Sequence, residues 1–364
     1  MKKRISIFFL LLLCPVLGLC LPKKPAAELQ KYNTVFMDTF DTVISLTGFA
    51  ETEEIFQEQA QAVHAAYQQM HKLFDTYHSY EDEGILSIYS LNERAATMPV
   101  KVDPILFSLL KFSKSQYALG QGQTNVAMGS VLSIWHDYRE AGLADPPSAS
   151  LPRMEDLKQA AKHTSIEDLI LDEDSMSVFF ADPMMQLDVG AVAKGYATEI
   201  VARMLLSGPM PSFIISAGGN VRLGNPPADG RAAWGVGVQD PDGAILGNNG
   251  IAETMYLHDT SVVTSGDYQR FYMVDGVSYH HLIDPDTLMP GAYCRSVTII
   301  TEDSGMADFL STSAYLMPYE ASRAFIDSLP EVEAVWLFDD GRSEMTDGIR
   351  PYVKSQGAQN PAKS

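Results

Sequence analysis

The sequence predicts an α+β protein with mixed sheets and flanking helices. Amphipathic helical segments and short alternating strands follow one another without the strict strand–helix alternation of a parallel sheet. Hydrophobic residues make up 46% of the 364 residues and charged residues 20%, so the chain can bury a sizeable core and is not generally disordered. At roughly 150 residues per domain, this length fits two domains or one large one.

Six segments have helical periodicity or end signals. In residues 51–74, apolar side chains recur at helical spacings, and the helix expected over 103–119 begins with a capping Asp103 before Pro104. The other helices are expected near 154–163, after residue 189 to about 206, near 306–317 and over 319–327.

Strands are expected wherever apolar residues alternate or form short runs. The segments are 35–46, 168–171, 177–180, 185–189, 213–215 and 334–338, with further alternating segments between 234 and 300. We expect one domain over residues 31–350, with its best internal boundary in a loop over 141–151 that contains Pro146 and Pro147. Residues 351–364 are expected to be a disordered tail.

The N-terminus predicts export. Residues 1–20 combine three basic residues with a short apolar run, which is typical of a secretory signal and too short for a membrane span. Cys20 stands where a bacterial lipoprotein carries its lipidated cysteine, but Leu19 is larger than the residue expected before it. A lipid anchor on the periplasmic face of the inner membrane, with residues 21–30 as a tether, and simple cleavage therefore both stay open.

Charge and cysteine content exclude other classes. The chain has 46 acidic and 26 basic residues, a net charge of −20, so it repels phosphate backbones and does not bind nucleic acid nonspecifically. Its cysteines, Cys14, Cys20 and Cys294, lack the paired spacing of zinc or iron–sulfur sites and are too few for a disulfide scaffold.

Residues 187–197 (LDVGAVAKGYA) are unusual for a core segment. Asp188 is followed by small residues and then by the start of a helix that carries Lys194. Small side chains allow a ligand close to the backbone, and a helix N-terminus with a lysine favours an anion. A tight turn closed by an Asp–Lys pair explains the pattern equally well. A second glycine turn, residues 216–220 (SAGGN), is likewise open to both interpretations.

Two further segments carry chemistry. His281 lies at a strand end before Asp284 and Pro285, where an imidazole could serve as a general base, while the adjacent His280 would point to the opposite face. Asp308 and Thr312 are four residues apart on one helix face and offer hard oxygen ligands that suit Mg²⁺. A structural histidine and a capping aspartate with a back-bonding threonine are the alternatives.

Taken in order, these motifs resemble the ApbE-type FAD:protein FMN transferases, formerly called thiamine-biosynthesis lipoproteins. The resemblance runs from about residue 37 to 316. It also includes residues 37–39 (MDT), the stretch 74–77 (FDTY) with Ser87 and Asn92 beyond it, residues 237–241 (GVQDP) and residues 264–268 (TSGDY).

The resemblance implies a fold of that type with FAD in a cleft and Mg²⁺ at its pyrophosphate. The FMN moiety is then transferred to a Thr or Ser hydroxyl of an acceptor protein, such as a respiratory electron-transfer subunit, and AMP is released. His281 would be the catalytic base, and Ala191, Asp308 and Thr312 would hold the metal. The implied FAD-binding residues are Met37, Tyr77, Gln123, Thr124, Asn125, Asp188, Lys194, Leu282 and Ile283.

The stretch 122–129 departs from the family pattern, because Asn125 replaces an aspartate and Ala127 a threonine. Two other functions therefore compete with transfer. One is an FAD pyrophosphatase, in which water attacks and free FMN results. The other is an exported protein that binds FAD without turnover.

Overall fold

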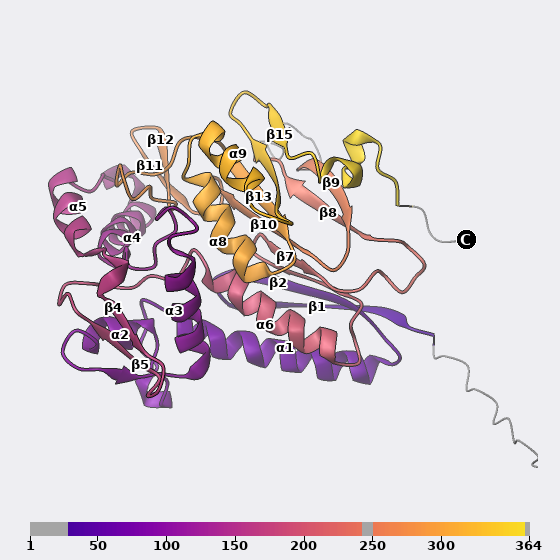
Figure 1. Cartoon of the computed structure of the whole chain (residues 1–364), viewed down its shortest axis with the longest axis horizontal. Helices are drawn as coiled ribbons and strands as arrows, with labels where there is room; N and C mark the ends of the chain where they lie inside the picture. The colour runs from indigo at the N-terminus through magenta and orange to yellow at the C-terminus, as the bar shows by residue number, and fades with distance from the viewer. Residues whose placement is uncertain (1–27, 242–249, 361–364) are drawn as a thin grey trace, which may run out of the picture.

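The computed structural model of the chain describes residues 28–241 and 250–360, and it contains an antiparallel sheet of eight strands (Figure 1). Its strand order is β1-β2-β6-β7-β10-β13-β14-β15, and every neighbouring pair is antiparallel. The bounds are β1 Gln30–Thr39, β2 Thr42–Ala50, β6 Phe213–Ala217, β7 Asn220–Leu223, β10 Ser261–Gly266, β13 Ser296–Thr301, β14 Glu333–Leu337 and β15 Ser343–Met345.

Helices cover one face of this sheet. Helices α6 and α8 lie side by side across it, with α1 alongside α6 and α9 beside α8 (Figure 1). Alternation along β10 and β13 sends Val263 and Ile299 into this layer, where they belong to the largest apolar cluster. The helices are α1 Glu53–Phe74, α6 Ala193–Ser207, α8 Ser304–Tyr315 and α9 Tyr319–Asp327.

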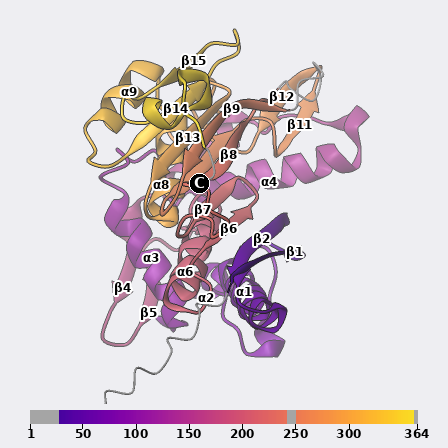
Figure 2. The ribbon, with the colours of Figure 1, turned by 90° about the vertical axis from the view of Figure 1, so that its right-hand side faces the viewer.

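A β-hairpin covers the opposite face. The neighbouring side chains Val262 and Ile300 point away from the helices and pack with Trp234 and Val236 of the hairpin. The hairpin consists of β8 (Trp234–Gln239) and β9 (Ile251–Leu257), and Figure 2 shows it on the side of the sheet away from α6. The sheet is therefore the middle layer of three.

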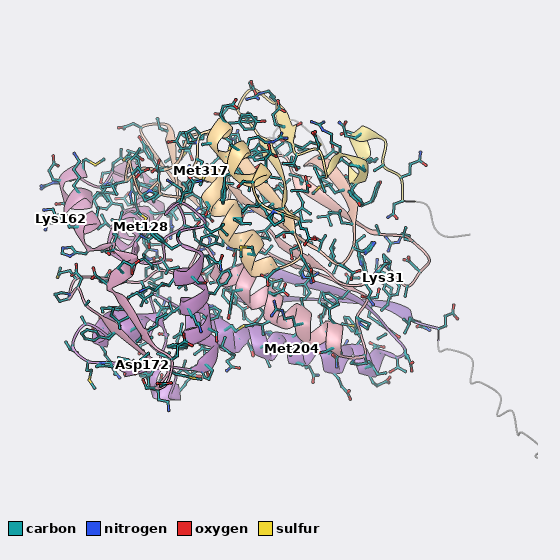
Figure 3. The ribbon with its side chains drawn as sticks, in the orientation of Figure 1. Lys31, Met128, Lys162, Asp172, Met204 and Met317 are labelled. Atoms are coloured by element: carbon teal, nitrogen blue, oxygen red, sulfur yellow. The ribbon has the colours of Figure 1, made fainter. Side chains whose placement is uncertain are left out.

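A third apolar cluster lies at one end of the molecule. It contains Trp135 of α4 (Gly129–Ala144), Leu157 of α5 (Met154–Ala160) and Tyr272 of the hairpin β11 (Phe271–Val274) and β12 (Val277–His280). In Figure 3, Met128 and Lys162 mark this end and Lys31 marks the other. His281 follows β12 directly, so this cluster sets the position of the segment that carries it.

The remaining elements lie below α4 in the view of Figure 1. They are α2 (Ile88–Arg94), α3 (Pro104–Gln116) and a small sheet of β3 (Val100–Lys101), β5 (Ser177–Phe180) and β4 (Leu169–Asp172). Asp103 caps α3 as its sequence predicts, since its Oδ1 accepts a hydrogen bond from the Ile105 N–H at 2.7 Å. The α+β class is confirmed, and each of the six expected helices is present.

Two strand predictions are wrong. The strand expected over 35–46 is a hairpin of β1 and β2, whose turn residues Phe40 and Asp41 both have positive φ. The segment 185–189 is extended but is not a strand. Asn92 takes the place of a neighbouring strand there, because its side chain donates to the carbonyl and accepts from the N–H of Leu187.

Two boundaries also need correction. Helix α4 was not predicted, and it continues to Ala144, so the loop expected over 141–151 begins only at Asp145. The tail expected to be disordered over 351–364 packs against β9 and β8 as far as it is described: the Ser355 N–H donates to Glu253 and the Asn360 amide to the Ala233 carbonyl.

The signal over 1–20 and most of the tether over 21–30 lie outside the described residues. Within the described ranges, every helix is too short or too polar to cross a bilayer.

Candidate functional site

A cavity of about 920 Å³ opens where the helix layer meets the α4 end of the molecule. This volume suits a large organic ligand. Its walls come from segments that are far apart in the sequence: the β1–β2 turn, the segment after α1, residues 123–125, the start of α6, the β6–β7 turn, residues 264–270, residues 281–283 and α8.

The contact between α6 and α8 forms the floor of the cavity. The Gly195 N–H donates to Asp308 Oδ2 at 2.7 Å. A Cβ at residue 195 would lie 2.4 Å from Asp308 Cβ and 2.3 Å from the Ser304 carbonyl oxygen, so only glycine allows this approach. The small residues of the 187–197 motif therefore serve helix packing as well as the cavity.

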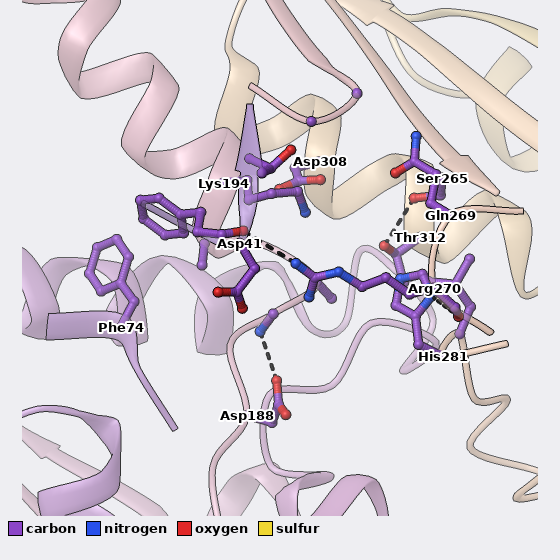
Figure 4. A pocket seen from close by; sticks show the side chains of 18 of the residues that line it. Asp41, Phe74, Asp188, Lys194, Ser265, Gln269, Arg270, His281, Asp308 and Thr312 are labelled. Carbon is purple, nitrogen blue, oxygen red and sulfur yellow. Dashed lines mark hydrogen bonds between the residues drawn. The ribbon is translucent and has the colours of Figure 1, made fainter. Parts of the chain in front are cut away.

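Asp308 is buried, at 4% exposure, yet it lines the cavity (Figure 4). Burial raises its pKa, while the positive charge of Lys194 and hydrogen bonds from Gly195 and Asn220 act in the opposite direction. The Oδ1 atom of Asn220 is itself buried, and it has no hydrogen-bond partner within residues 28–241 and 250–360. A cation beside Asp308 would hold the carboxylate ionised, so the donor set fits one.

The neutral oxygens near Asp308 are also hard ligands. Ala191 and Thr312 line the same cavity, and the Thr312 hydroxyl lies 3.3 Å from that of Ser265. Among the described residues, no three His, Cys, Asp or Glu side chains group as a metal site. A divalent cation here would thus depend on one carboxylate together with hydroxyl and carbonyl oxygens, a set that Mg²⁺ accepts.

Asp188 and Tyr77 form a second polar group in the cavity. Asp188 accepts hydrogen bonds from the Gly190 N–H at 2.8 Å and from the Tyr77 hydroxyl at 3.1 Å. His136 of α4 stacks on the Tyr77 ring, with ring centroids 3.8 Å apart, and Arg139 donates to His136 Nδ1. One face of Tyr77 is already covered, so a planar ligand can stack only on the other.

His281 lines the cavity, and one of its ring nitrogens has no hydrogen-bond partner among the residues that the structure describes. Its Nδ1–H donates to the Arg270 carbonyl at 3.2 Å, because a carbonyl oxygen can only accept, and this tautomer leaves Nε2 as an acceptor. Burial, followed by the positive charges of Arg270 and Lys194, lowers the pKa of His281 to about 3. The imidazole is therefore neutral at physiological pH, as a general base must be.

His280 points the other way, as the strand alternation predicts. It is buried, its Nε2–H donates to the Gly291 carbonyl at 2.8 Å, and its Nδ1 accepts from the Leu282 N–H. Both ring nitrogens are thus used inside the protein.

Residues 123–125 line the cavity, and hydrogen bonds to the backbone hold the side chains of Thr124 and Asn125 in place. Thr124 is buried and donates to the Phe309 carbonyl of α8. The Oε1 atom of Gln123 is buried and has no hydrogen-bond partner in the described part of the chain. The Asn125 amide donates to the Thr164 carbonyl, while its oxygen accepts from the Ala127 N–H. An aspartate has no N–H that could donate to the Thr164 carbonyl. The asparagine at residue 125, where the family pattern has an aspartate, therefore fits the contacts of this chain.

Of the residues expected at the site, all but Met37 line this one cavity, including Leu282 and Ile283. Met37 is 75% exposed on the outer face of β1, because it alternates with Phe36, which packs toward α1. Met37 therefore does not line this cavity, contrary to expectation, and Phe40 and Val43 near the turn do; a contact of Met37 with FAD stays a prediction.

Comparison with known proteins places this cavity in context. The family model described as "ApbE family" matches residues 40–336. An FAD:protein FMN transferase of Treponema pallidum is 32% identical over 316 residues, covering 81% of this chain and 83% of that protein. A protein of the same name from Vibrio cholerae is 24% identical and covers 91% and 94%.

Solved structures agree in fold. The crystal structure of the ApbE protein of Thermotoga maritima matches with a TM-score of 0.75 at 26% identity, covering 89% of this chain and 99% of that one. The flavin transferase ApbE of Vibrio cholerae matches with a TM-score of 0.73 at 22% identity, over the same shares, which supports the fold alone.

The His281 ring should stay neutral in the free protein from pH 8 down to about pH 4, because its pKa is near 3 rather than the usual 6.5. As the pH falls below 6.5, the unfolded chain takes up a proton that the folded chain refuses, so this residue lowers stability in acid. NMR titration of the ring, assigned with His281→Asn, measures the pKa directly. A midpoint near 6.5 would show that the ring is exposed to solvent and far from the cations.

Proposed function

The chain belongs to the ApbE family, and from this membership and the cavity we infer that it is an FAD:protein FMN transferase. The protein transfers the FMN moiety of FAD to an acceptor protein. One observation assigns this function to particular residues. The same cavity is lined by the buried carboxylate of Asp308, with hard oxygens near it, and by the neutral imidazole of His281, whose Nε2 can accept a proton.

We propose that the acceptor presents a Thr or Ser hydroxyl. Its oxygen forms a bond to the phosphorus of the FMN half, the P–O bond to the AMP half breaks, and AMP leaves with the bridging oxygen. The hydroxyl proton passes to His281 Nε2, which the Arg270 carbonyl holds in the accepting tautomer. Respiratory electron-transfer subunits are acceptors of this kind.

The proposed metal residues are Asp308, Thr312 and Ala191. Bound there, Mg²⁺ would neutralise negative charge on the pyrophosphate and on the leaving AMP. Lys194, at the first turn of α6, would add a positive charge next to Asp308, and Tyr77 would offer its open ring face to a planar part of FAD.

The protein is also proposed to be exported. The signal in residues 1–20 would place the enzyme on the periplasmic face, either free or anchored through Cys20. The acceptors would then be exported redox proteins.

Replacing the base tests the mechanism. His281→Asn should lower the rate of FMN transfer by about 10²–10⁴-fold while FAD affinity is kept, since a positioned base contributes that much. Covalent flavin on the acceptor and flavin fluorescence on binding are the two measurements. His258→Asn, which changes a histidine outside the cavity, is the matched control. Equal rates in both variants would leave His281 without a chemical role.

Removing the carboxylate tests the metal site. Asp308→Ala should abolish Mg²⁺-dependent transfer, because a hydroxyl and a carbonyl alone hold Mg²⁺ too weakly. The wild type, treated with EDTA, should regain activity on addition of Mg²⁺, and the variant should not. Asp174→Ala removes an acid that lies outside the cavity and should behave as the wild type. Full Mg²⁺ response in Asp308→Ala would place the metal elsewhere.

A further inference from the structure

Arg270 differs from the other arginines of the chain. Within residues 28–241 and 250–360, each of the others has a carboxylate within 4.0 Å. Arg270 has none among the described residues, although the chain carries 46 acidic residues and a net charge of −20. Its guanidinium donates a hydrogen bond from Nη2 to the Phe40 carbonyl at 3.2 Å.

The side chain lies across the cavity. Arg270 is the residue before β11, and Figure 4 shows it extending from the His281 side toward the β1–β2 turn beside Asp41. It is exposed, so a ligand in the cavity can reach it. Its positive charge also lowers the pKa of His281, and only the burial of the imidazole has a larger effect. The guanidinium is therefore near the proposed base.

A neutral carbonyl is a weak partner for a guanidinium. A phosphate accepts two parallel, charge-assisted hydrogen bonds from the same group, and such bonds are roughly twice as strong as neutral ones. An unpaired arginine beside a base, in a cavity of this size, is thus suited to an anionic phosphoryl group.

We propose that Arg270 binds the phosphoryl group that is transferred, and that its guanidinium exchanges the Phe40 carbonyl for the phosphoryl oxygens. This rests on the proposed function. As the acceptor oxygen bonds to phosphorus and AMP departs with the bridging oxygen, negative charge is spread over the oxygens that the guanidinium contacts. Arg270 then serves the reaction twice, through its carbonyl, which orients His281, and through its side chain, which stabilises the transition state.

Three variants of the full chain test this role. Arg270→Gln removes the charge, Arg270→Lys keeps it without the planar fork, and Arg153→Gln removes a surface charge outside the cavity. Each is assayed for kcat of FMN transfer, and for equilibrium affinity toward FAD and toward riboflavin, which has no phosphate.

We expect Arg270→Gln to lower kcat by about 10²-fold or more and FAD affinity by about 10-fold, with riboflavin affinity unchanged. Arg270→Lys should retain part of the rate, added guanidinium should restore part of it to Arg270→Gln, and Arg153→Gln should match the wild type. Unchanged kcat in Arg270→Gln would overturn the proposal. So would equal losses in the Gln and Lys variants without guanidinium rescue, or an equal loss of riboflavin affinity. A wild type that transfers no FMN would instead refute the proposed function.

Discussion

The close approach of α6 to α8 at Gly195 is the constraint on which the site depends. Because residue 195 has no Cβ, its N–H reaches Asp308 at 2.7 Å, and a buried carboxylate is held at the cavity floor. A second polar contact joins the same two helices: Glu199 of α6 accepts hydrogen bonds from the Ser304 N–H of α8 and from the buried Arg222. Helix α6, which has Lys194 in its first turn and follows Ala191, and helix α8, which carries Thr312, are thereby fixed against each other.

The cavity separates two electrostatic environments. Around Asp308, burial raises the pKa of the carboxyl group and the charge of Lys194 lowers it, so a cation bound there would also favour the ionised carboxylate. Around His281, burial and the charges of Arg270 and Lys194 disfavour the imidazolium, which keeps a base free. In the proposed transfer, the two perturbed groups would have complementary roles, one beside a positive centre for the pyrophosphate and the other as a neutral base for the hydroxyl.

Much of this site could be predicted from the sequence, because its residues lie in short contiguous motifs. Periodicity puts Asp308 and Thr312 on one helix face and separates His281 from His280, but it left a structural role open for each of them. The resemblance to the ApbE family supplied their roles in the site and the remaining cavity residues.

The rest depends on contacts that sequence does not display. The resemblance put Met37 at the ligand, but the alternation of β1 turns its side chain outward. The hairpin of β1 and β2 looked like one strand because the reversal at Phe40 and Asp41 lacks a glycine or Asn-Gly signal. His136, Arg139 and Arg270 were missed since only tertiary packing brings them to Tyr77 and the turn. A signal for α4 did exist in the spacing of Val131, Trp135 and Tyr138.

The most direct test is a balance of products. The full chain is incubated with FAD, Mg²⁺ and an exported flavoprotein subunit, and the acceptor is analysed by peptide mass spectrometry while AMP and free FMN are quantified. The account predicts one FMN joined through a phosphoester to a Thr or Ser of the acceptor for each AMP released. AMP matched by free FMN, with the acceptor unmodified, would contradict it and identify water as the nucleophile.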